Sequence, residues 1–561
     1  MSALTRRIAF LAGVIGLLHV FTPPSFAAPV LTVGQNFLAS SYETNSQALP
    51  PDGNGAVGPQ QFVELINGSF AVFDKSDPGN VFRESDAIFW GNAGVSLTAS
   101  QAISDPRVIY DPLSQRWFAS MIDFDANATD PTTEANDFLI AFSLTSDATG
   151  DWKAFRITAD TSAKHAFADF PTLGVDSNAV YLSGNMFKGG TNNLGPNLVS
   201  FPKADLLNSN ISTRTYFGIL DPTNYGWVLQ PATCFDSAST NGTVLSMGDI
   251  GNFDDNDHSN MFTFHVIGAN HANAKLSTPV EITVDPYNTP FDANLGAPQF
   301  EAFQPDGTQL LQANDPRLSA KVYNVGGVLY GVHNTEFNNR IAIQWYRVNA
   351  ASGALLEQGM FSDADLDLYF PSIAANSDGT VVIGCNGSSV DTFISSFVYV
   401  GQIVGGVTTF GNRTLLQAGS VSYHDLNDIL GGLLGSPTDS RWGDYSATSV
   451  DPTDPTEIWT IQIIPTDVDN SDQTGFGQGI WSTWITQLQI ASPLPSLTIA
   501  PTGANVLISW PTSAAGFQLQ SNANLGTTNW IPVNLPLTTN GSQISTLVPD
   551  SGPQNFFRLK K

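Results

Sequence analysis

The sequence predicts an all-β protein built from a seven-bladed β-propeller and a small C-terminal β-sandwich. Three observations support this prediction. Glycine and proline are frequent, with 49 and 34 copies in 561 residues, while charged residues make up only 13%, which is typical of many short strands joined by turns. A strand–turn–strand motif recurs seven times. After the last copy, a proline-containing segment precedes further alternating strands.

The first 27 residues are predicted to be a signal peptide. Arg6 and Arg7 precede the apolar run 8–20, and Ser25-Phe26-Ala27 offers a cleavage site. The run is too short to span a bilayer, and no later apolar run is longer. We therefore expect a secreted protein, extracellular or periplasmic, with no membrane span after cleavage of the signal.

The repeated motif is a short apolar strand that ends in a turn residue, followed by a second apolar strand. The side chain of Asp or Asn at such a turn accepts backbone N–H groups two residues further on. A continuously apolar first strand is expected where both faces of a sheet are covered. The seven turn residues are Gly58, Asp111, Asp176, Asp236, Asn324, Asn376 and Asp451.

Two segments complete the predicted ring, which spans residues 28–490. The run Val30-Leu31-Thr32-Val33 is expected to add an outer strand to the last blade and so to remove an exposed sheet edge. The turn-rich stretch 285–316 is expected to be a long insertion between the fourth and fifth blades. No amphipathic helix of any length is predicted.

Residues 491–496, Ala-Ser-Pro-Leu-Pro-Ser, are predicted to be a linker. Residues 497–561 then contain alternating strands and are predicted to form the small β-sandwich. Gly516-Phe517-Gln518-Leu519-Gln520-Ser521, Asn529-Trp530 and Phe556-Phe557-Arg558-Leu559 resemble C-terminal fibronectin- or immunoglobulin-like modules of secreted bacterial proteins.

Charge and motif content exclude several functions. The formal net charge of −28 disfavours binding to phosphate backbones, so no nucleic-acid partner is expected. No HExxH helix, P-loop, GxGxxG or GxSxG motif is present, and no nucleotide, haem or flavin is expected. Cys234 and Cys385 each lie in an apolar strand and are predicted to be buried free thiols. We expect a monomer.

Two stretches resemble an uncharacterised family of secreted bacterial β-propeller proteins. They are Pro50-Pro51-Asp52-Gly53-Asn54-Gly55-Ala56-Val57-Gly58-Pro59 and Arg441-Trp442-Gly443-Asp444-Tyr445-Ser446 with Asp451-Pro452. Ser104-Asp105-Pro106-Arg107-Val108 belongs to the same pattern, and the family usually has Thr where this chain has Gly53. The resemblance covers roughly residues 45–490. It implies the fold and export, but no reaction, because fold does not fix function.

Alignment of the seven copies predicts a functional site. The starts of the inner strands of a propeller lie around one mouth of its axial channel, so polar residues at these starts should converge there. Seven and six residues before the turn, the copies place Asp52, Asp105, Asp169 and Asp444. Arg107, Arg317, Arg441 and Tyr369 are expected close by. Asp105, Asp169, Asp444 and Tyr369 are the catalytic candidates, and Asp52 and the three arginines the ligand-binding candidates.

Three interpretations of this mouth remain open. The acids could hold a divalent cation, for which Ca²⁺ suits hard oxygen ligands. Two carboxylates could act as acid and base, or as a nucleophile, on a glycan, since neighbouring like charges separate their pKa values. Arginines beside a tyrosine and an aspartate also resemble the sialidase arrangement. Alternatively, the aspartates could cap turns and pair with arginines that join adjacent blades.

A second calcium site is predicted in the loop that begins at Asp123. Asp123, Asp125, Asn127 and Glu134 match the spacing of oxygen ligands at positions 1, 3, 5 and 12 of an EF-hand loop. Ala128 stands where that loop requires glycine. The alternative is a solvated connection between strands.

Together these features predict a secreted propeller that binds an extracellular glycan or protein at its axial mouth, with a calcium ion as the expected cofactor. The alternative is a polysaccharide-active enzyme, a glycoside hydrolase or lyase, that uses the axial carboxylates.

Overall fold

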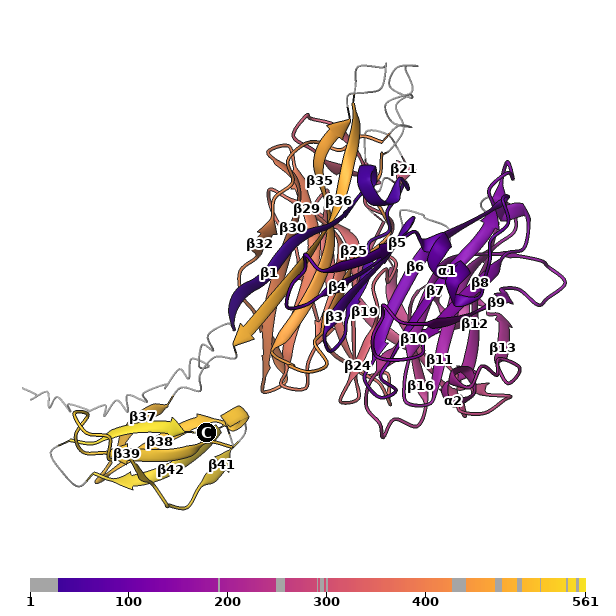
Figure 1. The fold of residues 1–561 in the computed structure, drawn as a ribbon. Coiled ribbons are helices and arrows are strands. Elements are labelled where there is room, and N and C mark those ends of the chain that lie inside the picture. The colour runs from indigo at the N-terminus through magenta and orange to yellow at the C-terminus, as the bar shows by residue number, and fades with distance from the viewer. Residues whose placement is uncertain are drawn as a thin grey trace, which may run out of the picture.

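The computed structural model describes most of the chain from residue 29 onward (Figure 1). The described residues are 29–189, 192–248, 258–289, 291–292, 297–298, 301–425, 440–469, 477–491, 497–514, 516–540, 543–550 and 554–560. The predicted signal peptide and residues 492–496 of the predicted linker lie outside them. Ala491 is the last residue of a strand.

Strands are the main secondary structure of the described residues, and those up to Ala491 form seven sheets of four or five strands with mainly antiparallel pairing. The first sheet contains β2 (Asn54–Val57), β3 (Gln61–Ile66), β4 (Ser69–Asp74) and β5 (Val81–Glu84). The second contains β6 (Gln101–Asp111), β7 (Arg116–Asp125), β8 (Asp137–Ser143) and β9 (Trp152–Thr158). The third contains β10 (Phe167–Val175), β11 (Ala179–Phe187), β12 (Asn193–Pro202) and β13 (Thr215–Ile219).

The next three sheets have five strands each. The fourth contains β14 (Trp227–Pro231), β16 (Gly242–Met247), β17 (His258–Ile267), β18 (Lys275–Leu276) and β19 (Val280–Tyr287). The fifth contains β24 (Tyr323–Val325), β25 (Val328–Phe337), β26 (Arg340–Asn349), β27 (Leu355–Phe361) and β15 (Thr233–Cys234), which pairs in parallel with β24. The sixth contains β28 (Asp367–Ala375), β29 (Thr380–Ser389), β30 (Thr392–Val404), β31 (Val407–Phe410) and β32 (Thr414–Gln417).

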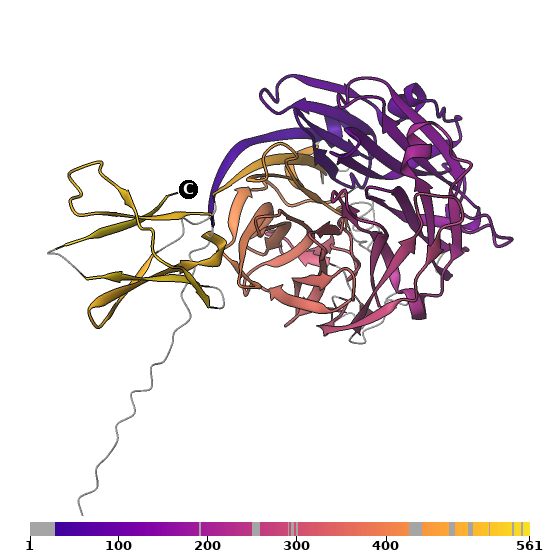
Figure 2. The ribbon, with the colours of Figure 1, turned by 90° about the horizontal axis from the view of Figure 1, so that it is seen from below.

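The seventh sheet joins the two ends of this part of the chain. It contains β34 (Ala447–Val450), β35 (Glu457–Asp469), β36 (Gln478–Ala491) and β1 (Val30–Ser41). β1 pairs with β36 in antiparallel register, as predicted for the run that begins at Val30. Figure 2 shows the sheets following one another around a ring, with the indigo β1 beside the last strands.

The turns after the inner strands form as the repeat predicts. Within the described residues, five of the seven turn side chains accept an N–H from the residue two positions further on, at 2.7 to 3.0 Å. They are Asp111, Asp176, Asp236, Asn376 and Asp451. Adjacent sheets pack through apolar faces; Ile109 and Phe118 of the second sheet share a buried cluster with Leu173 of the third.

The inner strands of four sheets contain an irregularity at the end opposite these turns. The pairing shifts between Ser104 and Arg107, Asp169 and Thr172, Trp227 and Gln230, and Tyr369 and Ser372. Within each shift one residue has positive φ: Asp105 (62°), Phe170 (51°), Val228 (54°) and Phe370 (46°). Such bulges re-aim side chains next to functional sites. The bulged residue of the fourth sheet is Val228.

The predicted insertion contains strands as well as turns. β20 (Phe291–Asp292) pairs with β21 (Ala297–Pro298), and β22 (Glu301–Phe303) pairs with β23 (Gln309–Gln312). β23 also pairs in parallel with β33 (Ser440–Arg441), which precedes the seventh sheet. The insertion therefore contacts the segment that contains Arg441 and Asp444.

Several short helices occur although the sequence predicted none of length. They are α1 (Asp86–Ala93), α2 (Lys203–Leu207) and α3 (Pro222–Tyr225), with single turns η1 (Tyr42–Ser46), η2 (Pro131–Thr133) and η3 (Thr512–Ala514). α1 is the longest; Ser85 accepts the N–H of Ile88 at its start, and Gly94 ends it with φ of 110°. No helix in the described ranges is both long and apolar enough to cross a membrane.

The residues after 497 form two further sheets with their own core. One contains β37 (Thr498–Thr502), β38 (Asn505–Pro511), β42 (Gln543–Pro549) and β41 (Thr538–Asn540). The other contains β40 (Ile531–Pro532), β39 (Gln518–Asn522) and β43 (Phe556–Lys560). Trp510 and Ile544 from the first sheet pack with Leu519 from the second.

Candidate functional site

Three buried aspartates converge at the end of the ring where the inner strands begin. Asp52 precedes β2, Asp105 lies in β6, and Asp444 precedes β34. One carboxylate oxygen from each lies within 4.8 Å of the others. We call these three residues the aspartate cluster. They come from the first, second and seventh sheets, so the closed ring brings them together.

Asn67 fixes two members of the aspartate cluster. Its Nδ2 donates to Asp52 Oδ2 at 2.8 Å, and its Oδ1 accepts the backbone N–H of Asp105 at 3.0 Å. The Asp105 carboxylate also accepts the hydroxyl of Ser104 at 2.8 Å and the backbone N–H of Phe170 at 3.1 Å. The positive φ of Asp105 therefore belongs to a fully bonded arrangement, which can hold such a backbone conformation.

Asp444 is held by groups from the insertion and by a neighbouring arginine. Asn314 Nδ2 donates to its Oδ1 at 2.9 Å, and Arg441 Nη2 lies 3.2 and 3.3 Å from its two oxygens. Gln312 accepts a 2.6 Å bond from Arg441 Nη1 and so fixes this guanidinium. The Arg441 side chain is 39% exposed, so the cluster borders solvent on this side.

Asp169 lies beside the cluster and is half-buried. It lines a hollow of about 230 Å³ together with Asp105, Ser104, Phe124 and Phe167. Arg317 pairs with Asp315 through two bonds of 2.6 and 2.5 Å and stacks 4.6 Å from the ring centre of Phe170. A ligand can reach Asp105 from solvent through this hollow.

Burial and mutual repulsion raise the pKa values of these acids. The pKa of Asp52 is raised well above its usual range, first by burial and then by Asp444 and Asp105. Burial, Asp169 and Asp444 raise the pKa of Asp105 to about 7. The pKa of Asp169 is raised by burial, although Arg317 opposes the shift. The site therefore gains stability from a proton or a cation at neutral pH.

Arg107 is buried near the three acids of the aspartate cluster. Its Nε and Nη1 donate to the carbonyl oxygens of Pro171 and Ser319 at 2.8 and 2.9 Å. Its guanidinium stacks on Tyr445 and Phe170, with distances of 3.5 and 5.0 Å to the ring centres. Arg107 thus joins several sheets across the ring.

Tyr369 occupies a different environment from the acids. It is fully buried, and its hydroxyl donates to Ser388 Oγ at 2.9 Å. Its ring packs in an apolar cluster with Trp442 and Tyr423. In the described part of the chain no hydrogen bond joins it to Asp105, Asp169 or Asp444, which leaves it a core residue.

The comparisons with known proteins add resemblances of fold. No family model and no curated protein matches the chain. Among solved structures, the WD40 domain of Toxoplasma gondii coronin is 8% identical with a TM-score of 0.39, over 84% of this chain and 88% of that one. A PL25 ulvan lyase is 9% identical with a TM-score of 0.37, over 77% and 93%. An exo-β-1,3-galactanase from Phanerochaete chrysosporium is 10% identical with a TM-score of 0.28, over 81% and 99%.

The fold is β-propeller-like. The small antiparallel sheets follow one another around a ring, as in a β-propeller. At this level of similarity, the function has to be argued from the aspartate cluster itself.

The structure does not assemble the predicted calcium loop. Asp123 and Asp125 both belong to strand β7, so the backbone here does not have the loop conformation that the spacing of the EF-hand ligands requires. Asp123 pairs with Arg156 at 2.7 Å, and Asp125 accepts the N–H of Asn127 at 2.9 Å. Glu134 is exposed. Asp123, Asp125 and Glu134 border one hollow, but among the described residues only the aspartate cluster groups three ligand atoms.

Sequence reasoning missed the residues that hold the acids in place. Asn67 belongs to an Asn-Gly pair between β3 and β4, which is a common sequence of hairpin turns. The pair therefore predicts only a turn, and not the bonds of Asn67 to Asp52 and Asp105. Gln312 and Asn314 lie in the insertion, far from Asp444 in sequence, and no local pattern marks them.

One carboxylate oxygen of the aspartate cluster has no hydrogen-bond partner among the described residues. This oxygen is Asp52 Oδ1, which is buried. A buried carboxylate oxygen without a partner is costly. Three carboxylates within 4.8 Å offer the hard oxygen ligands that Ca²⁺ or Mg²⁺ prefers.

Proposed function

We propose that this chain is a secreted seven-bladed β-propeller that binds an extracellular glycan or protein at its axial mouth, with a divalent cation held by Asp52, Asp105 and Asp444. Each of the seven sheets is one blade. Residues 1–27 are the signal peptide, 28–490 the propeller, 491–496 the linker and 497–561 a fibronectin- or immunoglobulin-like β-sandwich.

The observation that carries the cation site is the unpartnered Asp52 Oδ1 within the aspartate cluster. A cation between the three carboxylates would satisfy this oxygen and oppose the burial and repulsion that raise the pKa values of Asp52 and Asp105. Asn67 and Asn314 hold Asp52 and Asp444 in fixed positions, which suits a preformed ligand set.

The neighbouring hollow supports a glycan as the ligand. Phe124 and Phe167 offer apolar faces for a sugar ring, and Asp105 and Asp169 offer acceptors for its hydroxyl groups. Arg441, exposed at the rim, would pair with a carboxylate or sulfate of an acidic glycan.

Metal analysis and calorimetry test the proposal. The purified protein should contain, or bind after treatment with EDTA, one Ca²⁺ per chain, and binding should raise its melting temperature. The double variant Asp52→Asn with Asp444→Asn should lose both effects. Asp125→Asn, which removes an exposed acid outside the aspartate cluster, is the matched control and should retain them.

A glycan panel then tests the ligand. Binding that disappears with EDTA would support a cation-dependent glycan site. A protein that binds no divalent cation, or that binds it equally well after the double substitution, would contradict the proposal.

A polysaccharide-active enzyme is the second candidate, and the pKa of Asp105 favours it. A carboxyl group with a pKa of about 7 that faces a hollow beside a second acid is suited to general acid catalysis at neutral pH. Turnover of any glycan that Asp105→Asn abolishes, with the fold retained, would support an enzyme. Tight binding of a glycan without turnover of any member of the panel would instead support a binding protein.

A further inference from the structure

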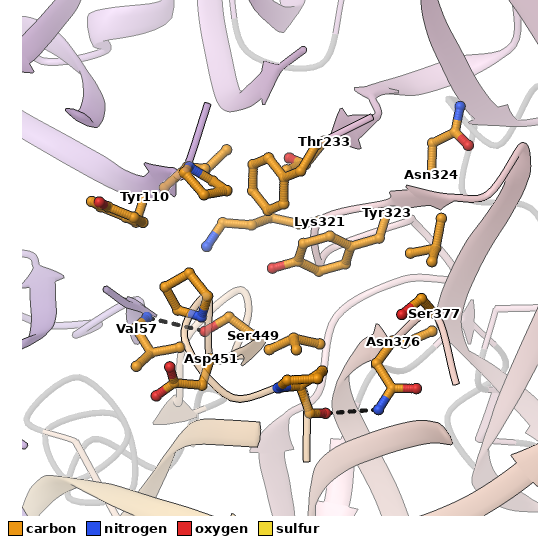
Figure 3. Close-up of a pocket in the computed structure, with 18 of the residues that line it drawn as sticks. Val57, Tyr110, Thr233, Lys321, Tyr323, Asn324, Asn376, Ser377, Ser449 and Asp451 are labelled. Atoms are coloured by element: carbon orange, nitrogen blue, oxygen red, sulfur yellow. Dashed lines mark hydrogen bonds between the residues drawn. The ribbon is translucent and has the colours of Figure 1, made fainter. Parts of the chain in front are cut away.

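A second cavity lies at the opposite ends of the inner strands (Figure 3). Its volume is about 300 Å³, and it is bordered by residues at the ends of β2, β6, β24 and β34, namely Val57, Tyr110, Tyr323 and Val450. The aspartate cluster lies where the inner strands begin. We call this second cavity the axial pocket.

The wall of the axial pocket is mainly apolar. Val57, Ile109 and Val450 line it together with the rings of Phe235 and Tyr323. Such a wall suits the body of a small apolar molecule, and the volume lies at the lower end of the range of ligand pockets.

Lys321 supplies a cation to this apolar wall. Figure 3 shows its side chain reaching across the pocket between Tyr110 and Tyr323. Only 6% of Lys321 is exposed. Its Nζ donates to the carbonyl oxygen of Gly55 at 3.1 Å and to Asn54 Oδ1 at the long distance of 3.4 Å. Within the described residues no carboxylate lies within 4.0 Å of this nitrogen.

Two polar groups near Lys321 have no hydrogen-bond partner among the described residues. Thr233 lines the pocket, is 1% exposed, and its hydroxyl has no partner among the described residues. The Nδ2 of Asn54, beside the lysine, also has none. Burial, and then Arg107, lower the pKa of Lys321 to about 7, as expected for an amine without an anionic partner.

Two acids line the pocket. Asp236 is exposed, whereas Asp451 is buried and its charge is paired with Lys75. A ligand with one carboxylate directed inward toward Lys321 fits this distribution, whereas a second carboxylate would meet Asp236.

We propose that the axial pocket is a second binding site, for a small monocarboxylate with an apolar or aromatic body, whose carboxylate accepts hydrogen bonds from Lys321 and Thr233. The apolar body lies against Phe235, Tyr323 and the aliphatic side chains of the wall. This site needs neither the aspartate cluster nor a metal ion, so it stands apart from the function proposed above.

Isothermal titration at pH 6.5 with benzoate and its neutral isostere benzamide tests the proposal on the wild-type protein. Benzoate should bind about tenfold more tightly than benzamide, because an ion pair formed in a buried pocket contributes about 1.4 kcal/mol or more. EDTA should leave the affinity for benzoate unchanged. Equal affinities, or no binding of benzoate at millimolar concentration, would overturn the proposal.

Variants locate the site. Lys321→Met keeps the length of the side chain and should abolish the preference for benzoate over benzamide. Lys275→Met makes the same change at an exposed lysine of β18 and should leave the preference intact. If Lys321→Met does not fold, Thr233→Val provides the second test and should lower the affinity for benzoate several-fold. An unchanged preference in Lys321→Met or an unchanged benzoate affinity in Thr233→Val would contradict the assignment.

Discussion

The guanidinium of Arg107 lies 3.5 Å from the ring centre of Tyr445, although the two residues belong to opposite ends of the sequence. Arg107 comes from the second sheet, and Tyr445 stands next to Asp444 before the seventh. The same guanidinium donates to Pro171 and Ser319. This single side chain therefore joins the second and third sheets to the segments that precede the fifth and seventh.

Substitution of Arg107 should destabilise the whole ring. Arg107→Met leaves the carbonyls of Pro171 and Ser319 without donors and removes the stacking on Tyr445, so we expect a loss of about 3 kcal/mol in the free energy of unfolding. Guanidinium unfolding measures it. Arg214→Met, at a half-buried arginine that also stacks on a tyrosine and donates to a carbonyl, is the control and should cost less than about 1 kcal/mol. Equal losses in the two variants would contradict a central role for Arg107.

Asp105 should make the stability of the metal-free protein depend on pH. Its folded pKa of about 7 lies above its unfolded value of about 3.9, so the folded state binds more protons between these values. The free energy of unfolding should therefore fall as pH rises from about 4 to about 7. Asp105→Asn removes this dependence, so the variant should resemble the wild type at pH 4.5 and exceed it in stability at pH 8.

Urea unfolding in EDTA at several pH values measures this difference. The exposed Asp391→Asn substitution changes the same charge and should follow the wild type at every pH. Ca²⁺ at pH 8 should remove the advantage of Asp105→Asn, since the cation compensates the wild-type carboxylate. A parallel pH profile for Asp105→Asn and wild type would argue against the raised pKa.

The sequence predicted local features of the ring better than its interior contacts. The Asp and Asn turns could be predicted because an Asx turn depends on one side chain and the next two residues, as at Asp111 and Asn376. None of the four bulges was predicted, because an extra residue in a strand leaves no mark in the apolar pattern, as at Val228. Tyr369 lies in the core instead of beside the acids for a related reason. It borders the bulge at Phe370, and residues on either side of a bulge face different surroundings.

The residues around Asp444 illustrate a second limit. Asn314 and Gln312 reach the site only because β23 pairs with β33, more than a hundred residues away. The predicted calcium loop illustrates the opposite limit, since the spacing of Asp123 and Asp125 matches a loop but the backbone there is a strand. Spacing predicts chemistry only when the backbone conformation is known.

β1 should be required for a closed, monomeric ring. It covers the edge of β36, and Ser40 and Thr483 both donate to the buried carboxylate of Glu64. Deletion of residues 29–41 exposes that edge, and exposed edges associate with other chains. We expect oligomers in size-exclusion chromatography with light scattering, and recovery of the monomer when a peptide of residues 30–41 is added. Deletion of residues 497–561, which have their own core, is the control and should leave a monomer.

Cys234 and Cys385 should both behave as protected thiols. Both are free and buried, as the sequence predicted, and burial raises the pKa of Cys385 to about 12. Because the thiolate is the reactive form, neither should react with Ellman's reagent at pH 8 in the folded protein, and both should react in 6 M guanidinium. Cys234 is 5% exposed and Cys385 is not exposed. Near the unfolding midpoint, the reagent should therefore label Cys234 faster than Cys385. Cys234→Ser should remove this faster phase and so identify it. Fewer than two thiols after unfolding without reductant would indicate a disulfide, and rapid labelling of the native protein would show that the strands β15 and β29 open readily.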